Sequence, residues 1–92
     1  MRTQTTDLQL PLVHLNGTGI KTLTEDYDAA DDAFHGFMDS FGNIEFNARD
    51  YYPLGSEAWE KAVDARSEIN QKIRDIKDYL DAHRAHLYSF AR

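Results

Sequence analysis

Arg49, Tyr51 and Tyr52 lie close together in a segment that separates two helix-like patterns. Arginine offers a planar fork of N–H donors that fits a carboxylate or a phosphate, and tyrosine offers a flat apolar face with a polar tip. This combination suits an anionic, aromatic ligand such as a nucleotide. In the alternative interpretation, Phe46 and both tyrosines plug the open end of a helix pair, and Arg49 ties down a helix terminus.

The turn Asn16-Gly17-Thr18 is the second candidate for anion binding, because backbone N–H groups before a helix N-terminus can cradle an anion. If the helices pack antiparallel, this turn and Arg49 lie at opposite ends of one chain. A joint ligand site built from Asn16, Gly17, Thr18, Arg49, Tyr51 and Tyr52 therefore requires a junction between subunits.

Metal and catalytic sites are poorly supported by the sequence. Two sets have helical spacings that could hold a metal, namely Asp28, Asp31, Asp32 with His35, and His83 with His86. Neither set is complete, and the chain has no cysteine, no glycine-rich phosphate loop and no paired nucleophile and base. We expect no metal, no cofactor and no enzymatic activity.

A long helix is predicted from Ser56 to Phe90, with Ser56 as its N-cap, because apolar residues recur there in alternating steps of three and four. Such spacing is typical of a helix packed lengthwise on another helix. At about 50 Å, this helix is longer than its partner can cover, so we expect oligomerisation. The predicted oligomer seam comprises Trp59, Ile69, Ile73, Ile76, Leu80 and Leu87.

A shorter amphipathic helix of about 35 Å is predicted from Gly19 to Phe41. Thr18 can cap its first turn, Thr22-x-x-Glu25 is an alternative capping box, and Gly42-Asn43 provides a left-handed stop. The expected fold is therefore all-α, an antiparallel helical hairpin with a short extended segment at Leu10–Leu15 before it.

An acidic stripe formed by Glu25, Asp28, Asp32 and Asp39 follows one face of the shorter helix. The stripe can simply keep that face solvated, or it can bind a basic partner, including a protein that normally grips DNA.

Length and charge set the remaining bounds. The 92 residues predict one domain, with a loose tail up to about Gln9. The net charge of −6 comes from the first half, where eight acidic residues face two basic ones up to Phe46. This balance disfavours direct binding of nucleic acid, and no apolar run suggests a membrane span or signal peptide. We expect a soluble, cytoplasmic protein.

Two motifs, His14-Leu15-Asn16-Gly17-Thr18 and Arg49-Asp50-Tyr51-Tyr52-Pro53-x-Gly55-x-x-Ala58-Trp59, occur in matching order and spacing in a known family. The chain resembles, from about Leu12 through its second helix, a family of short phage and prophage proteins that is largely uncharacterised. It departs from the family pattern at Gly19-Ile20-Lys21, where a serine and polar helix-starting residues are usual. The resemblance implies a phage source, a bacterial host and a helical-hairpin plan more firmly than an activity.

The sequence favours a nonenzymatic binding protein of the phage accessory type that acts as an oligomer. In the leading hypothesis, it sequesters a small anionic signal of host defence, such as a nucleotide, at a subunit junction. In the alternatives, it inhibits a host protein through the acidic stripe, or it is an assembly factor that acts through its helical seam.

Overall fold

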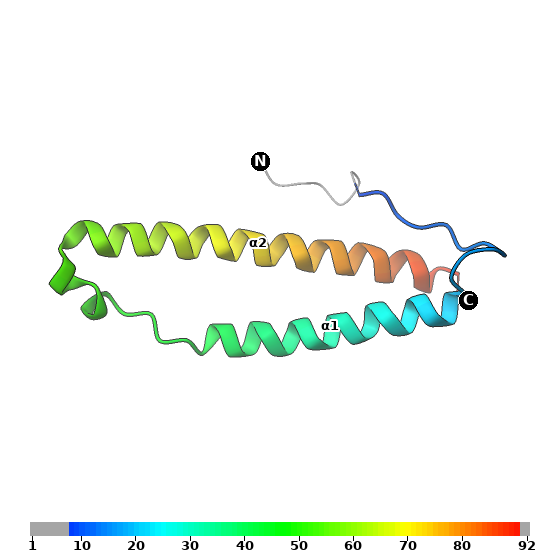
Figure 1. Cartoon of the computed structure of the whole chain (residues 1–92), viewed down its shortest axis with the longest axis horizontal. Coiled ribbons are helices and arrows are strands. Elements are labelled where there is room, and N and C mark those ends of the chain that lie inside the picture. Colours follow the sequence, from blue (N-terminus) through cyan, green and yellow to red (C-terminus); the bar gives the residue numbers. More distant parts are fainter. Residues whose placement is uncertain (1–7, 91–92) are drawn as a thin grey trace.

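The computed structural model describes residues 8–90 as two long helices joined by a connector (Figure 1). Helix α1 spans Ile20–Gly42, the short 3₁₀ helices η2 and η3 span Ala48–Asp50 and Tyr52–Leu54, and helix α2 spans Ser56–Tyr88. No strand occurs within these residues. The prediction of an all-helical chain with two packed helices is confirmed.

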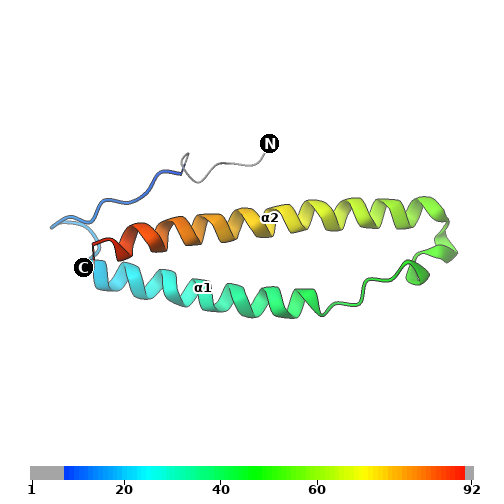
Figure 2. The same cartoon turned by 180° about the vertical axis from the view of Figure 1, so that it is seen from behind.

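The two helices lie side by side and run in opposite directions, as both the front and the back views show (Figures 1 and 2). Contacts between their side chains define the register of this helix pair. Near one end, the rings of Tyr27 and His83 stack at 5.1 Å, and near the other the Arg66 guanidinium lies 4.7 Å from the Phe41 ring centre. The chain is thus elongated, with extents of 61 × 26 × 20 Å.

The apolar core of the helix pair is thin. Among the described residues, the buried hydrophobic side chains are Phe34, Leu80 and Leu87. Leu80 and Leu87 are seven residues apart and therefore share one face of α2, which packs on α1. Within the predicted seam, these two leucines are covered by the chain itself, whereas Ile69 and Ile76 remain 40% and 48% exposed. Oligomerisation through the seam stays a prediction.

The helix starts differ from the predicted caps. Helix α1 begins after Gly19 without a side-chain cap, so Thr18 does not fill this role, and Thr22 and Glu25 lie inside the helix. Helix α2 has Gly55 as its N-cap, and Ser56 is its first helical residue rather than its cap. The sequence suggested hydroxyl caps because serine and threonine are common there. Here Gly19 and Gly55 occupy the N-cap positions instead.

The end of α1 also differs from the prediction in conformation, although its position agrees within a residue. Gly42 is the last helical residue, and Asn43 follows it with φ −87° and ψ −5°, which is right-handed backbone. The N–H of Asn43 donates to the carbonyl of Ser40 at 3.2 Å. The helix therefore ends in a tightened last turn and does not use the left-handed stop expected for Gly42-Asn43.

Gly55 should be sensitive to substitution, because its φ of 104° and ψ of 161° lie in a region that residues with a Cβ rarely adopt. We expect Gly55→Ala to lower the free energy of unfolding by roughly 1–3 kcal/mol. Gly36→Ala is the matched control, because Gly36 lies inside α1 with open space around its Cα. This control should stabilise the chain by up to about 1 kcal/mol. Urea unfolding of both variants, followed by circular dichroism, checks the contrast, and equal effects would contradict it.

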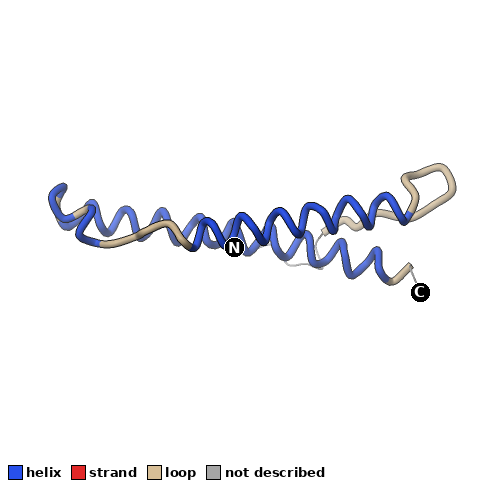
Figure 3. Tube along the Cα trace, turned by 90° about the horizontal axis from the view of Figure 1, so that it is seen from below, coloured by secondary structure: helices blue, strands red, loops and turns tan. Residues whose placement is uncertain are grey.

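The segment before α1 is loop, and its first part lies along α2 (Figures 1 and 3). The Nε2 atom of His86 donates a hydrogen bond to the Pro11 carbonyl at 2.6 Å. Leu10 and Val13 are half-buried, but Leu15 is 98% exposed. The predicted loose tail up to Gln9 lies mostly outside the described residues.

Candidate functional site

The connector is anchored by an aromatic cluster of Phe46, Tyr51 and Trp59. The Phe46 and Trp59 ring centres are 4.8 Å apart, and Tyr51 lies 6.0 Å from Phe46 and 5.6 Å from Trp59. Phe46 belongs to the loop after α1, whereas Trp59 lies in the first turn of α2. Phe46 and Tyr51 therefore behave as the plug interpretation expects, and they brace the two 3₁₀ helices against α2.

Arg49 and Tyr52 point outward from this braced connector. Both side chains are exposed, Tyr52 by 64%. Neither makes a hydrogen bond, ion pair or ring contact with any described residue, so Arg49 does not tie down a helix terminus. The structure thus separates the two tyrosines, with Tyr51 held in the cluster and Tyr52 available at the surface.

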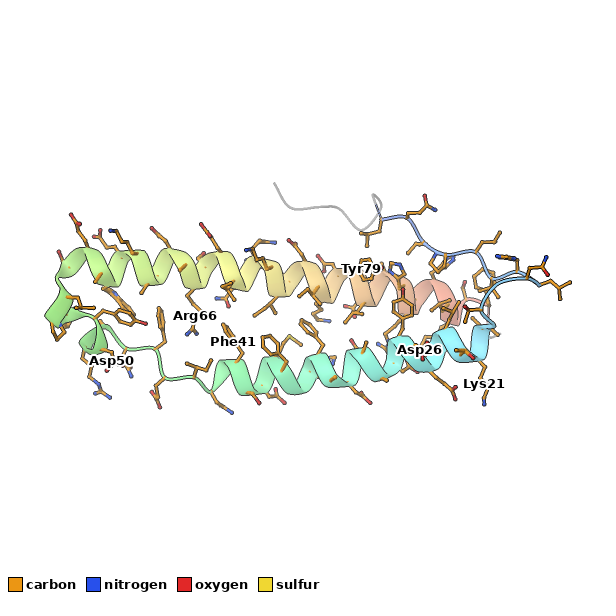
Figure 4. All side chains as sticks on the ribbon, viewed as in Figure 1. Lys21, Asp26, Phe41, Asp50, Arg66 and Tyr79 are labelled. Carbon is orange, nitrogen blue, oxygen red and sulfur yellow. The ribbon has the colours of Figure 1, made fainter. Side chains whose placement is uncertain are left out.

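Arg66 is a further charged residue at this end that the ligand hypothesis left out. Its guanidinium carbon lies 4.7 Å from the Phe41 ring centre and 4.3 Å from that of Phe46. Figure 4 shows Arg66 and Phe41 pointing toward one another across the space between the helices. The signal in the sequence was an arginine at an apolar position of the three-four pattern. This contact between cation and rings closes the connector end of the helix pair.

The turn Asn16-Gly17-Thr18 is exposed, and it lies at the end of the helix pair opposite the connector (Figure 1). The N–H of Gly17 donates to the His14 carbonyl at 3.1 Å. A Cβ on Gly17 would come within 2.8 Å of the ring of His14, whose exposed side chain would have to shift. One chain does not bring the turn to Arg49, and no pocket occurs among the described residues.

Asp28 does not lie freely in the acidic stripe. Its Oδ1 accepts a hydrogen bond from Arg84 Nε at 2.9 Å, and its Oδ2 accepts one from the Tyr88 hydroxyl at 2.5 Å. The Tyr88 and Arg84 hydrogen bonds lower the pKa of Asp28, and the bond to Asp28 raises the pKa of Tyr88. Asp28 therefore links α1 to the end of α2.

The other stripe residues remain at the surface. Asp32 and Asp39 are exposed and make no hydrogen bond or ion pair with any described residue. Glu25 is exposed as well, and its carboxylate lies 3.7 Å from the Lys21 ammonium. The stripe is accordingly reduced to two free carboxylates and a weakly paired third one.

Asp31 is an acidic residue of α1 that was not included in the predicted acidic stripe. Only 6% of it is exposed, and its Oδ2 lies 3.3 Å both from Arg84 Nη1 and from His35 Nδ1. Its Oδ1 has no hydrogen-bond partner. Its position three residues before the core residue Phe34 was the available signal, but the partner on α2 was not visible from spacing. Asp28, Asp31 and Arg84 together form a charged link between the helices.

The pKa shift of Asp28 predicts a pH dependence of stability. A lowered carboxyl pKa in the folded state stabilises the chain above the ordinary carboxyl pKa of about 4, and this contribution is lost as the pH falls through the lowered value. The melting temperature should therefore fall between about pH 5 and pH 2. Asp28→Asn should flatten this fall, whereas Asp32→Asn should leave it intact because Asp32 has no described partner. Thermal melts across this range would contradict the account if both variants matched the unmodified chain.

Two of the three histidines considered for metal binding, His83 and His86, serve packing roles. His83 is 2% exposed, stacks on Tyr79 at 4.1 Å and donates from Nδ1 to the Tyr79 carbonyl at 2.8 Å. His86 bonds to Pro11, as described above. Within residues 8–90, no group of three or more potential ligand side chains is arranged to hold a metal ion.

Comparisons with known proteins found no similar family model, curated protein or solved structure. The resemblance to phage proteins remains a prediction from the two motifs. Neither described helix combines the length and apolar character that crossing a membrane requires.

Proposed function

We propose that the protein is a nonenzymatic binding protein of the phage accessory type, which self-associates as antiparallel hairpins in the cytoplasm of a bacterial host. The assembly sequesters a small anionic, nucleotide-like molecule at the connector and so counteracts host defence. The observation that carries this proposal is that Arg49 and Tyr52 are exposed and contact no other described side chain. They lie on a connector that is held in place by the packing of Phe46, Tyr51 and Trp59.

The braced connector explains how these two side chains would bind. Because Tyr51 packs against Phe46 and Trp59, the backbone of η2 and η3 has little freedom, and Arg49 and Tyr52 are presented from a fixed base. An arginine fork pairs with phosphate through two parallel hydrogen bonds, and a tyrosine ring stacks on a base for about 1–3 kcal/mol. The two side chains together supply one contact for each half of a nucleotide.

Self-association would provide the concave ligand site that a single chain lacks. The connector of one chain has no pocket among the described residues. A small ligand gains most of its affinity when a concave site covers it, so a second copy must close over the connector. A site at a subunit junction also gathers more than one arginine, which offsets the net charge of −6.

The test is a thermal-shift screen against linear and cyclic nucleotides. Arg49→Ala should leave the melting temperature of the unliganded protein nearly unchanged, because the side chain is exposed and unpaired, but should eliminate stabilisation by the ligand. Arg74→Ala is the matched control, since Arg74 is an exposed arginine in the middle of α2, and this variant should keep the response. A lower melting temperature for Arg49→Ala with no nucleotide response in the unmodified protein would contradict the proposal.

A second candidate function is inhibition of a basic host protein through the acidic stripe. The exposed carboxylates of Asp32 and Asp39 favour it, because neither is engaged by a described residue. Asp32→Asn with Asp39→Asn should abolish such binding without loss of helicity, and salt should weaken the complex, since exposed charges are screened over about 10 Å at 0.1 M. Pull-downs from host lysate with the unmodified protein and with the double variant check this. Equal recovery of a partner would mean that the acidic stripe only keeps its face solvated.

A further inference from the structure

One flank of the helix pair exposes apolar side chains along its middle, next to the exposed Lys72. Phe37 and Ile76 are each 48% exposed, Ile69 is 40% exposed, and Ala30 and Ala33 are exposed as well. Ala30, Ala33 and Phe37 follow one another in steps of three and four on α1, and Ile69 and Ile76 are seven apart on α2. Each set therefore shares one side of its helix. We call these five residues the apolar face.

The charged link occupies the opposite flank. Asp31 precedes the buried Phe34 by three residues and Phe37 follows it by three, so the two lie on opposite sides of the core contact. On α2, Arg84 follows the buried Leu80 by four residues and Ile76 precedes it by four. Arg84 and Ile76 therefore also lie on opposite sides of the core contact. The flank with Asp31 and Arg84 is polar and internally paired, whereas on the other flank Phe37 and Ile76 remain about half exposed.

We propose that the apolar face binds a second copy of this chain, with the two-fold axis parallel to the long axis of the helix pair. In this arrangement α1 of each copy packs on α2 of the other, and both connectors lie at the same end. The proposal rests on the proposed function and specifies the surface and orientation of its self-association.

The register of the helix pair makes the apolar face self-complementary in this orientation. Interpolation between the contacts of Tyr27 with His83 and of Phe41 with Arg66 puts Phe37 level with the stretch between Ile69 and Ile76. A two-fold axis along the pair preserves these levels across the interface. Phe37 of one copy then inserts between the two isoleucines of the other, in the manner of a knob entering a hole.

Ala33 of α1 adds to this complementarity. By the same interpolation, Ala33 lies level with Ile76, so the large side chain of one copy meets a small one of the other. Alternation of large and small residues across facing helices is how close packing is reached without voids. A perpendicular two-fold axis would instead lay α1 on α1 and α2 on α2, and would reverse the levels of the side chains across the interface.

Charge favours the same orientation. Helix α1 has six acidic residues and one basic residue, whereas α2 has seven acidic and six basic residues. Packing α1 on α2 of the other copy keeps the two acidic helices diagonal to one another. Packing α1 on α1 would bring two strongly negative helices into direct contact, which is unfavourable.

The exposed area of the chain is consistent with a missing partner. The whole chain exposes 6983 Å², whereas a compact monomer of 10.6 kDa exposes about 5,500 Å². An interface of standard size buries about 800 Å² on each partner. A second copy on the apolar face therefore fits within the surplus of about 1,500 Å².

This orientation also decides which elements can share a ligand site. Two copies bring two connectors together, and with them two Arg49 and two Tyr52 side chains. The turn Asn16-Gly17-Thr18 stays at the far end in both copies. The anion site at the junction is then built from connectors alone, without the turn that the sequence suggested as its other half.

The surface is tested by light scattering at micromolar concentration on matched variants. Ile76→Asp should raise the dissociation constant of the dimer at least about 10-fold, because it desolvates an unpaired charge at the centre of the interface. Val63→Asp is the control, since Val63 is also 40% exposed but lies on the other side of α2. The milder pair Ile69→Gln with Ile76→Gln serves if Ile76→Asp loses helicity. Equal weakening by Val63→Asp, or none by the face variants, would overturn the proposal.

The orientation is tested with a single spin label, for which the absence of cysteine is convenient. A label on Ser56→Cys, at the connector end, should report a distance between copies comparable to the 26 Å width of the chain. A distance near its 61 Å length would overturn the parallel arrangement. A monomeric unmodified chain would refute self-association itself, whereas a dimer insensitive to Ile76→Asp would refute only this interface.

Discussion

Replacing Leu87 by alanine should lower the free energy of unfolding by about 2–5 kcal/mol. Leu87 has no exposed surface, and it is one of the three buried apolar side chains among the described residues. The loss combines the transfer of its methyl groups to water with the cavity left behind, and a core this thin has few other contacts to offset it. Urea unfolding at a fixed protein concentration measures the loss.

Leu15→Ala is the control for this prediction, because Leu15 is the same residue type with 98% exposure. Its free energy of unfolding should change by no more than about 0.5 kcal/mol. A comparable loss in the two variants would mean that the contact between α1 and α2 is not what stabilises the chain.

Replacing Arg84 by methionine should have the second largest effect on stability, because it breaks the charged link of Asp28, Asp31 and Arg84. The guanidinium lies 2.9 Å from Asp28 and 3.3 Å from Asp31, and Asp31 is almost completely buried. Methionine keeps much of the side-chain volume but leaves the Asp31 carboxylate without its cation. We expect a loss of roughly 2 kcal/mol, less than for a fully buried ion pair because Arg84 still reaches solvent.

A second substitution distinguishes the contribution of the Arg84 charge to stability from that of its packing. Asp31→Asn, added to Arg84→Met, removes the uncompensated negative charge and should restore most of the lost stability. The coupling free energy from this double-mutant cycle measures the link directly. Additive losses would show that Arg84 acts through packing on its neighbours and not through Asp31.

The two helices could be predicted because their signal is local. Three-four spacing of apolar residues marks a helix wherever it occurs, and the predicted ranges agree with α1 and α2 within two residues at every end. The helix caps could not be predicted as well. Hydroxyl residues lie next to both starts, but Gly19 and Gly55 occupy the N-cap positions without a side-chain cap, and the sequence does not reveal which residue takes the cap.

The partner of Asp28 could not be predicted, because Arg84 is 56 residues away and the pairing depends on the register of the helix pair. Local spacing placed Asp28 in the stripe with Asp32 and Asp39, yet only those two remain unengaged. Register follows from the packing of α1 on α2, as in the contacts of Tyr27 with His83 and of Phe41 with Arg66, and is a property of the assembled pair. The same register defines the apolar face.

The roles of the connector residues could be predicted only in part. Its residue types indicated both a plug and a ligand site, and nothing in the sequence distinguished the neighbouring tyrosines Tyr51 and Tyr52. In the structure the two 3₁₀ helices turn Tyr51 toward Trp59 and leave Tyr52 outside. Tyr51 therefore packs as the plug interpretation predicts, whereas ligand binding by Tyr52 stays a prediction.

Native mass spectrometry of the protein purified gently from bacterial cells tests the central claim most directly, because one spectrum reports both assembly and bound ligand. We predict an even-numbered oligomer of the 10.6 kDa chain that carries the extra mass of a phosphate-bearing molecule, and the loss of that mass in Arg49→Ala. A bare monomer, or an oligomer whose bound mass survives Arg49→Ala, would contradict the account.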